Sequence, residues 1–357
     1  MTYLDYQATT PLAPEALAAM LPWLESQHAN PHSPHREGRR ARAAVEVARD
    51  QIAALLPPGG RLAFTSGATE ALNWAIKGTQ GGIVTLATEH AAVLDTVQAS
   101  GRPVTILPVG ADGLVDLERA RAAIVPGTGL VAAMLVNNEI GVIQPVAALA
   151  DVAHEAGALM LCDAVQGYGR VPIPETVDLV AISAHKIHGP KGVGATWIRD
   201  GVELASLLHG GGQEAPGRSG TLSPALCAGF GVAASLMAER HDADADHVAG
   251  LFALAHSMLG GWHLNGALDH RYRGNLNIRR DGLDVNRLMS DLRDIAFSAG
   301  SACASGSGRS SHVLRAIGLS DAQARSSIRL GFGRYTTEAE LAEAIRAVAA
   351  AAEGQWR

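Results

Sequence analysis

Cysteine and long apolar runs are scarce in this chain of 357 residues, and each scarcity excludes a class of protein. The cysteines, Cys162, Cys227 and Cys303, are too few and too far apart for a disulfide framework or a structural zinc site. No apolar run approaches the ~18 residues that span a bilayer. The N-terminus also lacks the basic and apolar segments of a leader peptide. We therefore expect a cytoplasmic protein with no membrane partner and no bound metal.

A strong positive charge is lacking as well. Lys+Arg 29 against Asp+Glu 35 gives a net charge of −6, which argues against nucleic acid as the main partner. The glycine patterns of P-loops and of dinucleotide-binding folds are both missing from the sequence. Hydrophobic residues make up 47% of the chain, an ordinary value for a globular protein, and the length suffices for one large domain and a smaller one.

Apolar strand patterns alternate with helical patterns between residues 61 and 198. This order predicts an α/β fold with a mostly parallel sheet flanked by helices. Past about residue 225 the alternation stops, and the acidic stretch 241–246 marks a boundary. We predict a large domain over 13–240 and a smaller C-terminal α+β domain over 241–357, against which an extended arm of residues 1–12 packs.

Polar residues of different chemical types follow successive predicted strands of the large domain: Thr69, His90, Asn138, Asp163 and Lys186. Each one alone has an ordinary explanation as a helix cap, a loop histidine or a surface lysine. Together they lie where open α/β sheets bind ligands, at the carboxyl ends of the strands. A single ligand that carries a phosphate, a protonatable ring nitrogen and an aldehyde accounts for the whole set, and pyridoxal phosphate has these groups.

A second group of candidates lies in the predicted C-terminal domain. Residues 298–311 are Gly, Ala or Ser apart from Cys303 and Arg309, so this loop has little to bury. We expect an exposed and reactive thiol at Cys303, with an incidental cysteine as the alternative. Arg329, at a predicted strand start, is a candidate to hold a substrate carboxylate, and Arg334 competes with it.

The collected motifs resemble the cysteine desulfurases of the NifS/IscS type, group I, within the class V aminotransferase group of pyridoxal-phosphate enzymes. The resemblance runs from residue 3 to about residue 340. The matching stretches are 3–11, 30–33, 64–70, 88–96, 136–145, 163–166, 183–192, 210–214, 218–221, 300–303 and 326–329. It implies the type I fold of pyridoxal-phosphate-dependent transferases, and a homodimer.

The resemblance also implies a role for each matching residue. Lys186 would bond to the cofactor, His90 would stack on its ring and assist proton transfer, and Asp163 would pair with the ring nitrogen. Gln166 would bond the phenolic oxygen, and Thr221 would reach the phosphate in the other subunit. The remaining phosphate contacts would be Ala68, Thr69, Ser183 and His185, and the substrate carboxylate would be held by Asn138 and Arg329.

The implied activity is the conversion of L-cysteine to L-alanine, with the sulfur taken up by Cys303 as a persulfide. The implied partner is a sulfur acceptor in iron–sulfur cluster assembly or thiolation. This partner would be a sulfur acceptor or an iron–sulfur scaffold protein. Longer members dock the scaffold protein through a C-terminal extension, and this chain ends at Arg357, so the identity of the partner stays open. The alternatives are a selenocysteine lyase, another class V aminotransferase or lyase, or a cofactor-free partner protein. Intact Lys186, His90, Asp163 and Cys303 argue against the last.

Overall fold

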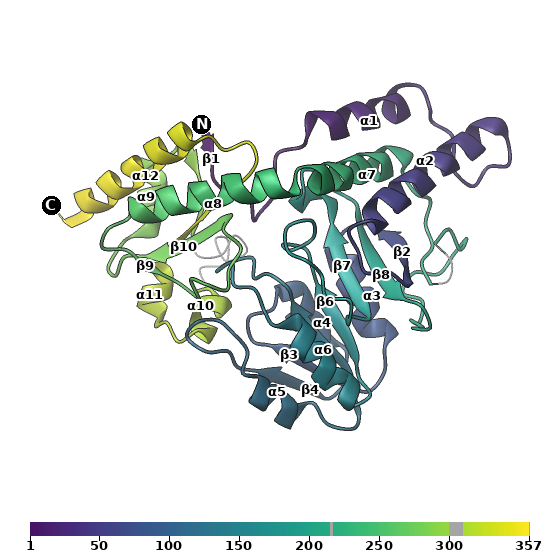
Figure 1. Ribbon diagram of the computed structural model, residues 1–357, viewed down its shortest axis with the longest axis horizontal. Helices are drawn as coiled ribbons and strands as arrows, with labels where there is room; N and C mark the ends of the chain where they lie inside the picture. The colour runs from purple at the N-terminus through teal and green to yellow at the C-terminus, as the bar shows by residue number, and fades with distance from the viewer. Residues whose placement is uncertain (215–216, 300–309, 357) are drawn as a thin grey trace.

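One large sheet forms the centre of the computed structural model, which describes residues 1–357 apart from 215–216, 300–309 and 357 (Figure 1). The strand order is β2-β8-β7-β6-β5-β3-β4. The bounds are Gly60–Thr65 for β2, Gly82–Leu86 for β3, Val104–Leu107 for β4, Thr128–Met134 for β5, Leu159–Asp163 for β6, Leu179–Ser183 for β7 and Gly194–Arg199 for β8.

The pairings are parallel from β7 to β4, so the predicted α/β class with a mostly parallel sheet is confirmed. Strand β8 departs from that pattern, because it runs antiparallel to both β7 and β2. Only residues 184–193 join β7 to β8. A link of that length cannot hold the crossover helix that a parallel neighbour requires.

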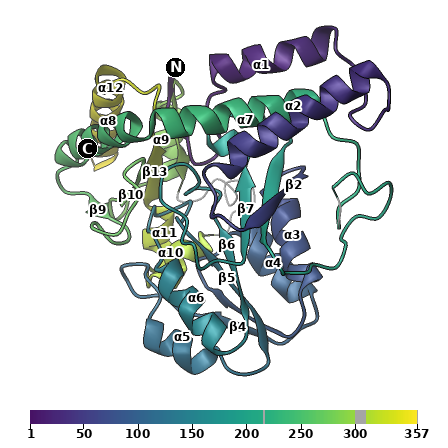
Figure 2. The ribbon, with the colours of Figure 1, turned by 45° about the vertical axis from the view of Figure 1, so that its right-hand side comes forward.

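Helices cover both faces of this sheet (Figure 2). Along β7, Val180 and Ile182 belong to the apolar cluster of one face, and Leu179 and Ala181 to that of the other. The first face carries α2 (Arg36–Ala53), α5 (Leu117–Ala123), α6 (Val146–Glu155) and α7 (Pro224–Glu239), with α1 (Pro14–Glu25) packed on α7. The second face carries α3 (Ala68–Gly78) and α4 (Ala91–Ala99). Burial from both sides explains why the central strand β7 is almost entirely apolar.

A separate apolar cluster lies under a four-stranded antiparallel sheet with the order β12-β13-β10-β9. Its strands are β9 (His263–Leu264), β10 (Asn275–Arg279), β12 (Ser298–Ala299) and β13 (Ser327–Gly331). The helices of this half are α8 (His241–Ser257), α9 (Val285–Asp291), α10 (His312–Ala316), α11 (Asp321–Arg325) and α12 (Glu338–Glu353). Short 3₁₀ turns, η1 and η2, cover Ala184–Lys186 and Gly354–Trp356.

The N-terminal segment connects the two halves. Strand β1 (Thr2–Tyr3) pairs with β11 (Ile295–Ala296), and Leu4 is fully buried in the cluster under the small sheet. The chain then crosses to α1 on the large sheet, as the purple trace of Figure 1 shows. The domain limits at 13–240 and 241–357 remain a prediction.

The acidic stretch 241–246, predicted to be a boundary, is the first turn of α8 (Figure 1). Asp242 and Asp244 suit that position, because carboxylates near a helix N-terminus are stabilised by the helix dipole. Val248, Leu251, Phe252 and Ala255 recur at helical spacing and are buried. The acidic residues at the start of α8 therefore drew attention away from the apolar pattern that identifies it as an amphipathic helix. Among the described residues, no helix is long and apolar enough to cross a membrane.

Candidate active site

A cavity of about 920 Å³ opens at the carboxyl ends of β5, β6 and β7. Nearly every residue that was predicted for the site lines it. These are Ala68, Thr69, His90, Asn138, Asp163, Gln166, Ser183, His185, Lys186 and Arg329. The structure therefore brings together residues that span more than 250 positions of sequence, and it does so where parallel sheets ordinarily bind ligands.

Lys186 ends the 3₁₀ turn that follows β7, and its ammonium group faces the N-terminal segment. Its Nζ donates a hydrogen bond to the Ala8 carbonyl at 2.8 Å and another to the Gln7 carbonyl. Burial, together with the charges of Arg329 and Arg170, lowers the pKa of Lys186 from 10.5 to about 8. A substantial fraction of the neutral amine, which is the nucleophilic form, is therefore present near neutral pH.

Asp163 and His90 lie close enough to affect each other's charge. Burial raises the pKa of Asp163, although a hydrogen bond from the Val165 amide at 3.0 Å opposes this. A cationic ring nitrogen beside Asp163 would hold the carboxyl group ionised. Burial also lowers the pKa of His90, so its imidazole is neutral. Its Nδ1 accepts from the Ala92 amide at 3.0 Å, which leaves the proton on Nε2.

The N-terminus of α3 supplies an anion site at one end of the cavity. Helix α3 begins at Ala68, and its N-cap, Gly67, has no side chain to satisfy the first-turn amides. No side chain caps this helix, so a plain helix cap, the ordinary explanation for Thr69, is not observed. Free amides and the helix dipole favour a phosphate there. Glu70 in the same turn also lines the cavity, where it accepts a hydrogen bond from the Ser66 amide at 2.7 Å and pairs with Arg218 at 2.8 Å, so Arg218 compensates its charge.

Gln166 tests whether the site fits the expected cofactor. Its Nε2 donates to the Gln7 carbonyl at 2.9 Å, whereas its Oε1 is buried without any hydrogen-bond partner. An orphaned buried polar atom of this kind calls for a ligand or a water. The cavity also offers an amine, a buried carboxyl group and an anion site. This set of groups fits pyridoxal phosphate, with Lys186 for its aldehyde, Asp163 for its ring nitrogen and α3 for its phosphate.

The two candidate arginines are separated by the structure. Arg329 is 1% exposed and lines the cavity, where its Nη1 donates to the Asn138 carbonyl at 3.0 Å. Its Nη2 donates to Asp5 Oδ1 at 2.7 Å, which fixes the orientation of the guanidinium group. Arg334 instead pairs with Asp244 at 2.6 Å and lines a different cavity.

The cavity tests neither Thr221 nor Cys303. Thr221 is exposed and lies outside the cavity as one chain forms it, and its contact with a second subunit remains a prediction. Cys303 lies outside the described residues. Cys162 and Cys227 are buried, and burial raises the pKa of both thiols, that of Cys227 to about 12. Neither of these two is a plausible thiolate near neutral pH.

Sequence reasoning missed two buried glutamates beside the site. Glu139 lines the cavity, accepts a hydrogen bond from Ser311, and has a pKa that burial raises to about 7. Glu89 is fully buried, and burial together with Asp163 raises its pKa well above the usual value. Each directly adjoins a residue that was selected, so proximity in sequence was an available signal. The backbone carbonyls of Gln7 and Ala8, which bind Lys186, could not be found in this way, because every residue has a carbonyl.

Comparisons with known proteins identify the family of the chain. The family model described as "Aminotransferase class-V" matches residues 2–343. The chain is similar to the "Cysteine desulfurase IscS" of Rickettsia bellii, with 42% identity over 97% of this chain and 90% of that protein. Its structure is similar to that of a "NIFS-LIKE PROTEIN", with a TM-score of 0.90, 32% identity and coverage of 97% and 98% of the two chains. The structure described as "SspA in complex with cysteine" is also similar, with a TM-score of 0.84, 34% identity and coverage of 94% of this chain and 100% of that one.

Proposed function

The chain belongs to the class-V aminotransferase family of pyridoxal-phosphate enzymes, and we propose that it is a cysteine desulfurase that converts L-cysteine to L-alanine. The observation that carries this proposal is the single cavity in which Lys186, Asp163 and His90 meet the anion site of α3. The named relatives support the substrate, since a similar protein was solved with cysteine bound.

Each side chain around the proposed cofactor site has a separate role in the reaction. Bound pyridoxal phosphate supplies an electron sink that acidifies the substrate Cα–H and weakens the Cβ–S bond. Lys186 would hold the cofactor and would move the proton at Cα, for which its lowered pKa suits it. Asp163 would hold the proton on the ring nitrogen. His90 would lie against the ring and assist proton transfer, and Gln166 would bond the phenolic oxygen.

Binding and orientation fall to the rim of the cavity. Ala68, Thr69, Ser183 and His185 hold the phosphate, and the partner subunit's Thr221 completes that site. Asn138 and Arg329 orient the carboxylate of the substrate. Arg329 suits this role because Asp5 and the Asn138 carbonyl already fix its guanidinium group, so little side-chain entropy is lost on binding.

The sulfur step requires a thiolate, which we assign to Cys303. Its Sγ forms a bond to the substrate sulfur while the Cβ–S bond breaks, and the electron pair released to the substrate takes up a proton to give L-alanine. The products are a Cys303 persulfide and alanine, so the step needs no external oxidant or reductant. The raised thiol pKa values of Cys162 and Cys227 favour Cys303 for this role.

Two partners complete the proposal. One is a second copy of the chain, supported by Leu17, Leu21 and Leu24, which are 43%, 41% and 64% exposed on one face of α1. The other is an acceptor that takes the persulfide sulfur, in iron–sulfur cluster assembly or in thiolation. A cytoplasmic location remains a prediction.

The deciding experiment compares wild type, Cys303→Ala and a matched control, Cys227→Ala, in the presence of L-cysteine and a thiol reductant. We expect wild type and the control to release alanine and sulfide in equal amounts. Cys303→Ala should lose both products while it keeps the visible absorption band of bound cofactor. If Cys303→Ala stays active, or wild type makes neither product, a selenocysteine lyase or a lyase for another amino acid becomes the better assignment.

A further inference from the structure

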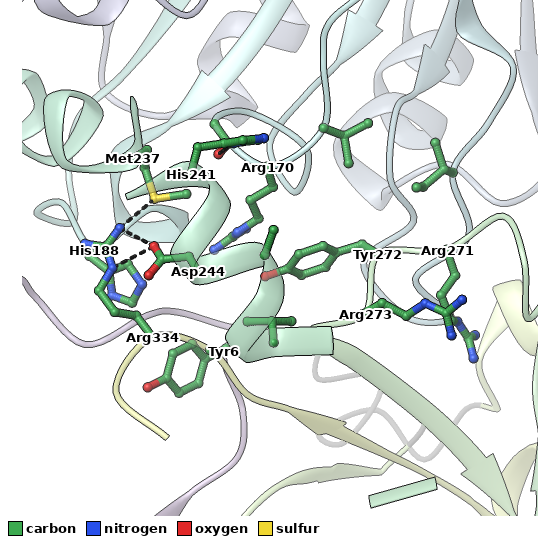
Figure 3. A pocket seen from close by; sticks show the side chains of 16 residues that line it. Tyr6, Arg170, His188, Met237, His241, Asp244, Arg271, Tyr272, Arg273 and Arg334 are labelled. Carbon is green, nitrogen blue, oxygen red and sulfur yellow. Dashed lines mark hydrogen bonds and ion pairs between the residues drawn. The ribbon is translucent and has the colours of Figure 1, made fainter. Parts of the chain in front are cut away.

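A second cavity of about 230 Å³ shares no lining residue with the active site (Figure 3). Its walls come from the start of α8, from residues 169–171 after β6, and from residues 271–273 before β10. Val171, Met237, Val248 and the Tyr272 ring give it apolar surface. Ligand sites of ordinary size run from roughly 300 to 1,000 Å³, so this volume suits a small molecule.

Positive charge dominates the lining. Arg170, Arg271, Arg273 and Arg334 face a single carboxylate, Asp244, in a chain whose overall charge is −6. That carboxylate is already taken, because Arg334 pairs with it at 2.6 Å. The other three guanidinium groups have no carboxylate partner in the part of the chain that the structure describes. Burial lowers the pKa of His188 to about 3, so this histidine adds no charge.

The arrangement of Arg271 and Arg273 makes the charge imbalance costly. Their Cζ atoms lie 5.7 Å and 4.9 Å from the centroid of the same Phe252 ring, and Figure 3 shows the two groups side by side. Arg271 is 4% exposed, and its Nε and Nη1 have no hydrogen-bond partner. Burial and the charge of Arg273 lower the pKa of Arg271 to about 10. An anion beside these groups would offset their repulsion.

Arg170 connects this cavity to the active site. Its guanidinium group lies at the cavity, 5.2 Å from the Tyr272 ring centroid. From there Nη1 donates to the Gln166 carbonyl at 3.2 Å and Nη2 donates to the Lys186 carbonyl. The charge of Arg170 also acts on the Lys186 ammonium group. One side chain therefore touches both the wall of the second cavity and the turn that carries the lysine.

We propose that this cavity binds a small organic anion, with a carboxylate or a phosphate group, and that Arg170 transmits its occupancy to Lys186. The arginines bind the anionic group and the apolar wall accommodates the carbon portion. The binding half of this inference is independent of the proposed desulfurase activity. The half that concerns Lys186 rests on the proposed cofactor.

Calorimetry on cofactor-saturated enzyme tests the binding half, since the cofactor then fills its own phosphate site. Inorganic phosphate and succinate are titrated separately, and the tighter probe identifies the anionic group. We expect one saturable site, weakened at least about tenfold in Arg273→Gln, which loses a charge-assisted hydrogen bond. Ala245→Phe should weaken binding similarly, because Ala245 is an exposed residue of α8 that lines the cavity, and the larger side chain would fill part of it. This change keeps every arginine.

Arg280→Gln is the matched control. It removes the same charge, but Arg280 lies over the Trp356 ring and not at the cavity, so binding should not change. Ala245→Phe keeps the test decisive if Arg273→Gln is poorly folded. The binding proposal is overturned if neither probe binds, or if Arg273→Gln and Ala245→Phe both bind as wild type does.

A spectroscopic titration tests the connection to Lys186. An anion in the cavity offsets the charge of Arg170, so the positive form of the Lys186 nitrogen is favoured. We expect the pH midpoint of the visible cofactor band to shift upward when the tighter probe is added, and to stay unchanged in Ala245→Phe. Binding without any shift in wild type would show that Arg170 does not carry the effect. An enzyme without a visible band would contradict the proposed cofactor and leave the calorimetry unaffected.

Discussion

Lys186 shows how the surroundings of one residue set its reactivity. Burial and the charges of Arg329 and Arg170 act in the same direction and lower its pKa from 10.5 to about 8. Since only the neutral amine attacks an aldehyde, the rate of covalent pyridoxal phosphate binding to apoenzyme should rise with pH through a midpoint near 8. Stopped-flow absorbance across a pH series measures this. Arg329→Gln should move the midpoint upward, and a wild-type midpoint near 10.5 would contradict the prediction.

Glu139 gives a second prediction for a single residue. Burial raises its pKa from 4.5 to about 7, so between these values the folded chain holds a proton that the unfolded chain has lost. Stability from this group is therefore present at low pH and is lost as pH rises through 7, by on the order of 3 kcal/mol. Glu139→Gln keeps an acceptor for Ser311 and removes the charge.

The measurement for Glu139 is the change in Tm between mildly acidic and mildly alkaline buffer. Wild type should lose more thermal stability than Glu139→Gln as pH rises. Equal losses in the two proteins would mean that Glu139 remains ionised in the fold.

Helix α1 presents an unpaired apolar face at the scale of one element. Ala16 and Met20 are buried against the rest of the chain, while Leu17, Leu21 and Leu24 recur at helical spacing on the exposed side. If this face meets a second copy, Leu17→Gln with Leu21→Gln should weaken the dimer at least about tenfold, because each change removes roughly 1.5–3 kcal/mol of apolar burial. Analytical ultracentrifugation reads the dimer constant.

The control for α1 is Val125→Gln, which alters a residue that is 50% exposed in the connection between α5 and β5. It should leave the dimer constant unchanged. If the α1 double variant also dimerises as wild type does, the interface lies elsewhere.

The N-terminal segment links the small sheet to the active site, so its effects belong to the scale of the whole molecule. Leu4 is fully buried under the small sheet, Asp5 pairs with Arg329, and the Gln7 and Ala8 carbonyls hold Lys186. Leu4→Ala should cost about 2–5 kcal/mol in stability and also lower kcat/KM for L-cysteine, since it loosens every later contact of the segment. Leu12→Ala, the same change at a residue that is 38% exposed, should do neither.

Thermal unfolding and steady-state kinetics on the two leucine variants separate these effects. A Leu4→Ala protein with reduced Tm but unchanged kcat/KM would show that the segment stabilises the small sheet without positioning Lys186.

Much of the site was determined by the sequence alone. Thr69, His90, Asp163 and Lys186 each lie at or just after the end of an apolar strand or at the start of the helix that follows it, and parallel strands bring their carboxyl ends to one edge of the sheet. Local patterns were therefore enough to predict the α/β class and several of the reactive groups that line the cavity. The strand at β8 was predicted, but its reversed direction was not. Helix α8 was missed, because its acidic first turn obscured the apolar pattern that follows.

Only the tertiary structure decided the rest. The carbonyls of Gln7 and Ala8 reach Lys186 across more than 170 positions, and a carbonyl has no residue-specific signature. The raised pKa of Glu139 and the uncompensated charge of Arg271 and Arg273 depend on which groups surround them. Sequence thus determined which chemical groups the protein has, and the fold decided their charge and contacts, because desolvation and pairing depend on neighbours that are distant along the chain.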